Sequence, residues 1–148
     1  MNINKFKNKI IKNKPLLGID FGEKRIGLAL SDSLLMIASP YKIVYSVKEF
    51  DAEIQKLDLG GVIVGYPLQM NGEEGEIAKK ARAFGDRIYT KFKLPIFLKD
   101  ERLSSCAVER MMIEEFDLSR EKRKKAIDKN AAAFILQGFL DQLSNIKE

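Results

Sequence analysis

The segment LLGIDFGEKRIGLALS, residues 16–31, predicts two core strands joined by a tight turn. Its first part, Leu16–Phe21, is a short apolar run with a single acid, Asp20, near its end, and such runs are typical of buried strands. Gly22-Glu23-Lys24-Arg25 has the composition of a turn, in which Gly22 can take a positive φ. A second strand over residues 25–31 completes a hairpin.

Strands and helices alternate along the rest of the chain. We expect further strands at residues 38–47, 61–65 and 94–98, and helices at 48–57, from Ser104 onward, and at 123–143. Asn71 and Glu74 have the spacing of a capping box and open another helix, in which Ile77 begins the apolar stripe. This order predicts an α/β fold, a mixed sheet with helices on its faces. We expect one domain over residues 16–148, after a basic N-terminal extension at residues 1–15.

Composition limits the function classes. The 148 residues suit one domain, and no segment approaches the roughly 18–20 apolar residues that a membrane-spanning helix needs. The Lys-rich start has no apolar run before a small-residue cleavage site, so we expect no signal peptide and a cytoplasmic location without membrane contact. A single cysteine, Cys106, excludes an internal disulfide and a cysteine-based zinc cluster.

The chain contains no histidine, which excludes histidine acid/base catalysis, histidine-bound zinc and Ser-His-Asp triads. A hydrolase of this composition must use carboxylates, with Mg²⁺ or Mn²⁺ as the expected cofactor. The net charge of +5 and pI near 9.2 favour a polyanionic partner only modestly. Two basic clusters are either solvated surface or binding surface: Lys5, Lys7, Lys9, Lys12 and Lys14, and Arg120, Lys122, Arg123, Lys124 and Lys125.

Acids stand at the ends of several apolar elements. Asp20 ends one predicted strand, and Asp100 and Glu101 follow another. Asp128 begins the last helix, before three alanines at residues 131–133 that would let this helix approach the sheet closely. Carboxylates that gather repel one another unless a cation neutralises them, and two such ions can promote phosphodiester hydrolysis. Taken singly, each acid is more often a cap, turn or surface residue.

The chain resembles the YqgF (RuvX) family, whose RNase H-like members are described as Holliday-junction resolvase-like or as pre-16S rRNA nucleases. The matching motifs are LGIDFGEKRIGLALSD at 17–32, VGYPLQMNG at 64–72 with Glu74-Gly75, KARAF at 80–84, DERLSS at 100–105, and KAID at 125–128 followed by Ala131-Ala132 and ILQ at 135–137. Tyr66 and Lys99 depart from the family pattern, and the first fifteen residues exceed its usual lead.

The resemblance implies an RNase H-like (RuvC-like) mixed five-stranded sheet with helices on both faces. It also implies a catalytic and metal-binding site at Asp20, Glu101 and Asp128, with Asp100 as a substitute or auxiliary ligand. It implies structured RNA, namely pre-16S rRNA matured at its 5′ end, as the substrate.

Four cations are candidates for nucleic-acid binding: Lys24, Arg25, Arg102 and Lys125. An arginine can donate two parallel hydrogen bonds to one phosphate, although ion pairs that hold the carboxylates are an equal alternative for Lys24, Arg25 and Arg102. Gly65 and Gly72 are expected to permit close backbone approach or turn geometry, for the substrate or merely for the loop.

Three alternatives stay open. The first is a resolvase that acts on branched DNA with the same site, as a dimer, since nothing in the residues distinguishes RNA from DNA. For the chain itself we expect a monomer or weak homodimer. The second is a nucleic-acid-binding regulator without turnover, which the retained acids disfavour. The third is an actin-like ATPase lobe, suggested by Asp20-Phe21-Gly22, although such proteins need two lobes and this chain has residues for one.

Overall fold

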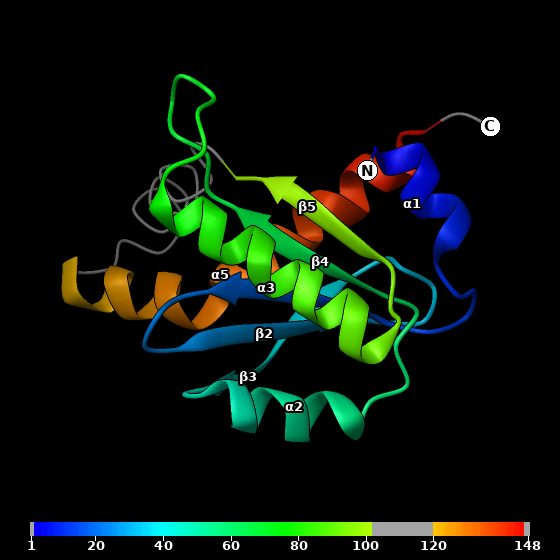
Figure 1. Ribbon diagram of the computed structural model, residues 1–148, viewed down its shortest axis with the longest axis horizontal. Coiled ribbons are helices and arrows are strands. Elements are labelled where there is room, and N and C mark those ends of the chain that lie inside the picture. Colours follow the sequence, from blue (N-terminus) through cyan, green and yellow to red (C-terminus); the bar gives the residue numbers. More distant parts are fainter. Residues whose placement is uncertain (1, 102–119, 147–148) are drawn as a thin grey trace.

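A five-stranded mixed sheet forms the centre of the computed structural model, which describes residues 2–101 and 130–146 in full and the backbone alone at 120–129. The strands are β1 (Leu16–Phe21), β2 (Ile26–Ser31), β3 (Ala38–Val44), β4 (Gly61–Tyr66) and β5 (Ile96–Asp100). Their order is β3-β2-β1-β4-β5, as Figure 1 shows. β1 pairs antiparallel with β2 and parallel with β4, and β4 pairs parallel with β5. The expected mixed five-stranded sheet is confirmed.

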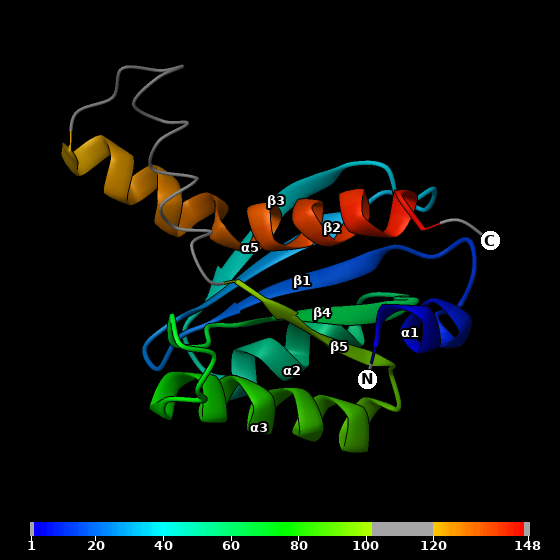
Figure 2. The same cartoon turned by 90° about the horizontal axis from the view of Figure 1, so that it is seen from above.

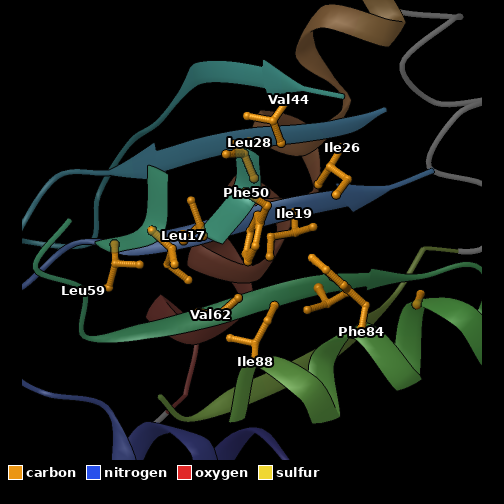
Figure 3. Packing of buried hydrophobic residues seen from close by; sticks show 13 residues of the cluster. Leu17, Ile19, Ile26, Leu28, Val44, Phe50, Leu59, Val62, Phe84 and Ile88 are labelled. Carbon is orange, nitrogen blue, oxygen red and sulfur yellow. The ribbon is translucent and has the colours of Figure 1, made fainter. Parts of the chain in front are cut away.

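Helices cover both faces of this sheet (Figure 2). α2 (Val47–Gln55) and α3 (Glu76–Phe92) pack on one face, in a cluster that includes Phe50, Phe84 and Ile88 (Figure 3). α1 (Ile3–Lys9) and α5 (Arg120–Ser144) contribute to the core of the other face. No helix in the described part of the chain is long and apolar enough to cross a bilayer.

The predicted hairpin of β1 and β2 forms, and its turn needs glycine at position 22 because the backbone comes close to itself there. Gly22 does not use the positive φ that a glycine can take. Its N–H donates to the carbonyl oxygen of Arg25 at 3.0 Å, and a Cβ on Gly22 would lie 2.8 Å from that oxygen. Glycine is therefore needed here for close backbone approach rather than for backbone handedness.

The expected capping box at Asn71 and Glu74 is wrong, because both side chains are engaged elsewhere. The Asn71 side chain accepts from the Glu73 N–H at 3.0 Å, which makes a local turn, and Glu74 accepts from the hydroxyl of Tyr66. The helix begins later, at Glu76, after a Gly75 cap that makes no side-chain hydrogen bond. Ile77, expected on the buried stripe, is in the first turn and 57% exposed.

Two other boundaries differ from expectation. β3 ends at Val44 rather than at residue 47, because Ser46 caps α2 by accepting from the Glu49 N–H at 3.1 Å. β5 extends through Asp100, so this acid belongs to the strand and Glu101 alone follows it. The predicted helix from Ser104 lies outside the described residues.

The Lys-rich N-terminal segment is folded rather than frayed. Asn2 caps α1 by accepting from the Lys5 N–H at 2.8 Å. Phe6 is fully buried, with its ring 5.6 Å from that of Phe97 on β5 and 5.4 Å from that of Phe139 on α5. This aromatic contact fixes α1 against the edge of the sheet.

Candidate active site

The carboxyl ends of β1 and β5, which flank β4 in the parallel part of the sheet, bring acids to one edge of the sheet. Asp20 is the penultimate residue of β1 and pairs with Gly27 on β2. Asp100 ends β5 opposite Tyr66 on β4, and the Glu101 N–H donates to the Tyr66 carbonyl at 3.2 Å. Because β1, β4 and β5 point the same way, Asp20, Asp100 and Glu101 lie at a common edge.

Two glycines make room for Asp20 and Glu101 on the face that α5 covers. A Cβ on Gly65 of β4 would lie 2.8 Å from the Glu101 Oε2 and 2.8 Å from the Ile135 Cδ1 of α5. A Cβ on Gly27 would lie 3.7 Å from the Asp20 Cβ and 3.8 Å from the Ala132 Cβ of the same helix. Asp20 shares a face with its ladder partner Gly27, and the Glu101 carboxylate lies over Gly65 beside Ile135, so both acids are on the face that α5 covers. The expected close approach at Gly65 is confirmed.

A hollow of about 220 Å³ lies beside Asp20 and is lined by Asp20, Gly22, Arg25, Gly27 and Ile43. Ile43 on β3 pairs with Gly27 on β2, which pairs with Asp20 on β1. The three residues therefore lie side by side on neighbouring strands and share one face of the sheet. The missing side chain of Gly27 leaves this space open. A volume of this size accommodates several water molecules together with a polar group.

The electrostatics of the acid cluster favour a cation. Burial, followed by the negative charges of Asp20 and Asp100, raises the pKa of Glu101 to about 8. A carboxyl held among other acids loses its proton readily only when positive charge is nearby. The cluster is therefore a site where a cation would be bound favourably.

Small residues let α5 press against the sheet over these acids. A Cβ on Gly18 of β1 would lie 2.7 Å from the Leu136 Cβ and 3.0 Å from the Ala132 carbonyl oxygen. Ala132 itself is 2% exposed, which confirms that this stretch of small residues permits close approach. Asp128 is in α5 one helical turn before Ala132, but its side chain lies outside the described residues.

Arg102 and Lys125, like Asp128, lie outside the residues described in full. Within those residues, no three acidic or cysteine side chains gather closely enough to hold a metal ion. The described part of the chain thus supplies the carboxylates of Asp20 and Glu101 on the α5 face, with Asp100 at the end of β5.

The turn between β1 and β2 presents the cations Lys24 and Arg25, both exposed. An ion pair between Glu23 and Lys80 ties this turn to α3. Arg25 also lines the hollow beside Asp20, where a phosphate group would meet it.

The loop between β4 and α3 stands beside the same edge (Figure 1). Tyr66 donates its hydroxyl to Glu74, and Arg82 of α3 binds the other carboxylate oxygen of Glu74 at 3.0 Å. Gly72 has φ 87°, which confirms the expected turn geometry at this glycine.

Sequence reasoning missed the roles of Gly18, Gly27 and Ile43. Glycines inside two apolar strands were a signal for close backbone approach, and only Gly65 was interpreted in that way. The place of Ile43 depends on the pairing of β3 with β2, which no local pattern indicates.

Comparison with known proteins identifies relatives over nearly the whole chain. The family model RuvX, described as Holliday junction resolvase, matches residues 14–142. A protein of Phenylobacterium zucineum named "Putative pre-16S rRNA nuclease" is 40% identical over 141 residues, which are 90% of each chain. A protein of Chelativorans with the same name is 45% identical over 141 residues, covering 90% of this chain and 87% of that one.

Among solved structures, Thermus thermophilus RuvC in complex with a Holliday junction substrate superposes with a TM-score of 0.50 at 17% identity. The match covers 90% of this chain and 98% of the RuvC chain. At this identity the likeness concerns the fold alone, and it confirms the RuvC-like, RNase H-like architecture expected from the sequence.

Proposed function

Because the chain belongs to the RuvX family, we propose that it is a nuclease that hydrolyses phosphodiester bonds at the edge of the sheet where Asp20 and Glu101 meet. The observation that carries the proposal is the pair of glycines, Gly27 and Gly65, that leave room for two carboxylates on the α5 face, with an open hollow beside Asp20. A structural acid pair would need no such space.

The donor set fits a divalent ion. Carboxylate oxygens are the ligands that Mg²⁺ and Mn²⁺ prefer. The raised pKa of Glu101 reflects its burial and then the negative charges of Asp20 and Asp100, and a cation would offset both effects. We propose Asp20, Glu101 and Asp128 as the ligands, with Asp100 as an auxiliary. The position of Asp128, one turn before the buried Ala132, supports its inclusion. When bound, the ion would lower the pKa of a coordinated water and stabilise charge on the leaving oxygen.

The chain's own residues bind and orient the phosphodiester. Arg25, on the wall of the hollow, is positioned to donate to a phosphate oxygen, and Lys24 in the same exposed turn adds positive charge. We propose the same role for Arg102 and Lys125. Glu101, held by its backbone hydrogen bond to Tyr66, keeps its carboxylate over Gly65 and so fixes one side of the reacting group.

We propose 5′-end maturation of pre-16S rRNA as the reaction, acting in the cytoplasm as a monomer or weak homodimer. Its support is the name shared by relatives that are 40–45% identical over about nine-tenths of the chain. Cleavage of branched DNA is the second candidate, favoured by the description of the matching family model.

Side-by-side assays separate these substrates. Purified protein with Mg²⁺ or Mn²⁺ would be given a pre-16S rRNA 5′ fragment and a DNA four-way junction of equal concentration. We expect cleavage of the RNA, and preferential cleavage of the junction would overturn the RNA assignment. If neither is cut while both are bound equally by the protein and its Asp20→Asn variant, the protein is a binding factor and not a nuclease.

A further inference from the structure

Lysines gather on the N-terminal segment, which the proposed active site does not use. The first nineteen residues contain five lysines and no acid. Lys5, Lys9 and Lys12 are exposed, and within the described part of the chain these three form no ion pair. We call these three residues the N-terminal lysine patch. Lys14, by contrast, is neutralised by Asp58 at 2.7 Å.

The patch is held in place by the core. Phe6, between Lys5 and Lys9, is fully buried against β5 and α5. Beyond the helix, the Ile11 N–H donates to the Gly60 carbonyl oxygen at 3.0 Å. Lys5 and Lys9 are four residues apart in α1 and therefore share one helix face. Their charges thus occupy a defined surface rather than a mobile tail.

A single strand relates the patch to the acids. A Cβ on Gly61, at the start of β4, would lie 3.0 Å from the Phe6 ring, and a Cβ on Gly65 would lie 2.8 Å from the Glu101 carboxylate. Residues four apart in a strand share a face, so α1 and the Glu101 carboxylate lie on the same face of the sheet. Their separation along β4 is about 13 Å, at roughly 3.3 Å per residue.

This spacing suits the phosphates of a duplex. Successive phosphates of one strand lie about 3.4 Å apart along the axis of a DNA duplex and somewhat closer in A-form RNA, so about 13 Å corresponds to roughly four or five base pairs. α1 lies near the start of the edge strand β5, whose far end carries Asp100 and leads to Glu101 (Figure 1). A duplex that runs alongside β5 can reach the acids at the end of this strand and the patch near its start together.

We propose that the N-terminal lysine patch binds the phosphate backbone of a duplex arm of the substrate, about four or five base pairs from the bond to be cut. This inference rests on the proposed nuclease function and adds a second contact that anchors the substrate. Because lysine contacts phosphate as a point charge, the patch contributes affinity and not sequence preference.

The test compares two double variants of equal charge. Lys5→Gln/Lys9→Gln removes two charges of the patch. Lys48→Gln/Lys79→Gln removes two exposed lysines, on α2 and α3 at the opposite face, that form no ion pair among the described residues. All are made with Asp20→Asn so that the RNA stays intact. Binding of a fluorescein-labelled RNA hairpin with a stem of about 20 base pairs is followed by fluorescence anisotropy. The KCl concentration is varied from about 50 to about 200 mM, the range over which affinity from phosphate contacts falls steeply.

The patch variant should bind about tenfold more weakly at 100 mM salt, and its slope of log affinity against log salt should be shallower by about 1.4–1.8, at roughly 0.7–0.9 per lost contact. Lys12→Gln alone, outside the helix, should reduce the slope by about half as much. The α2/α3 variant should keep the slope of the parent protein.

Equal loss in the patch and control variants would reduce the effect to net charge and overturn the proposal. So would unchanged RNA binding by the patch variant with loss of binding to phosphatidylglycerol vesicles, since the patch would then serve a membrane. Cleavage by the protein with Asp20 intact is measured separately. Failure there rejects the nuclease function, whereas an unchanged salt slope rejects only the patch.

Discussion

Replacing Glu101 with Gln should stabilise the metal-free protein at high pH. Burial and the charges of Asp20 and Asp100 raise the pKa of Glu101 from its ordinary 4.5 to about 8. Between these values the unfolded chain has lost the proton while the folded chain retains it. Folded protein then binds more protons than unfolded protein, so the free energy of unfolding falls as pH rises through this window. Glutamine is neutral throughout and avoids that loss.

The size of the effect follows from the shift. At about 1.36 kcal/mol per pH unit, a rise from 4.5 to about 8 has an upper limit near 5 kcal/mol. Glu101 is half-buried, and water reaching its carboxylate reduces this value. We expect Glu101→Gln to raise the free energy of unfolding by about 1–3 kcal/mol at pH 8 and to have little effect at pH 4.5.

Urea denaturation with EDTA at pH 4.5 and pH 8 measures this difference. Glu73→Gln, in the exposed loop before α3, is the matched control and should leave stability nearly unchanged at both pH values. Added Mn²⁺ should stabilise the parent protein at pH 8 and the Glu101→Gln variant much less. A variant that is no more stable than its parent at pH 8, or a gain equal at both pH values, would refute this reasoning.

Four further variants test other parts of the account. Asp20→Asn should abolish Mg²⁺- or Mn²⁺-dependent cleavage while RNA binding, measured by anisotropy, persists. Gly65→Ala places a Cβ 2.8 Å from the Glu101 carboxylate and should lower kcat by at least about tenfold, with helical content by circular dichroism retained. Gly18→Ala crowds α5 and should cost about 1–3 kcal/mol in urea denaturation. Lys42 and Tyr41 bind the Glu53 carboxylate and lower its pKa from 4.5 to about 2, so the ionised carboxylate stabilises the fold at pH 7 and this contribution is lost between about pH 4.5 and pH 2. In thermal melts Glu53→Gln should therefore be less stable than the parent protein at pH 7, and the difference should disappear toward pH 2.

Much of the fold was predictable because its strands are short apolar runs with clear ends. Leu16–Phe21 was predicted with the boundaries that the structure has, since apolar residues stop where the turn begins. Boundaries set by side-chain contacts were not predictable. The start of α3 moved because Tyr66 and Arg82 hold Glu74, and neither contact can be seen in a local pattern.

The site was predictable in its acids and not in the space around them. Asp20 and Glu101 interrupt or end apolar runs, which singled them out in the sequence. The hollow beside Asp20 depends on Gly27 and Ile43, which are brought alongside it by strand pairing. The anchoring of α1 was equally hidden, because the lysines around Phe6 made its segment resemble a solvated terminus.

The central claim, that Asp20, Glu101 and Asp128 hold a divalent ion, is tested most directly by a crystal soaked in MnCl₂. Anomalous scattering locates manganese independently of any assumption about its ligands. We predict a peak at the carboxyl ends of β1 and β5 within about 2.3 Å of oxygens from all three acids. Manganese bound elsewhere, or an acid cluster that stays without a peak at saturating Mn²⁺, would contradict the claim.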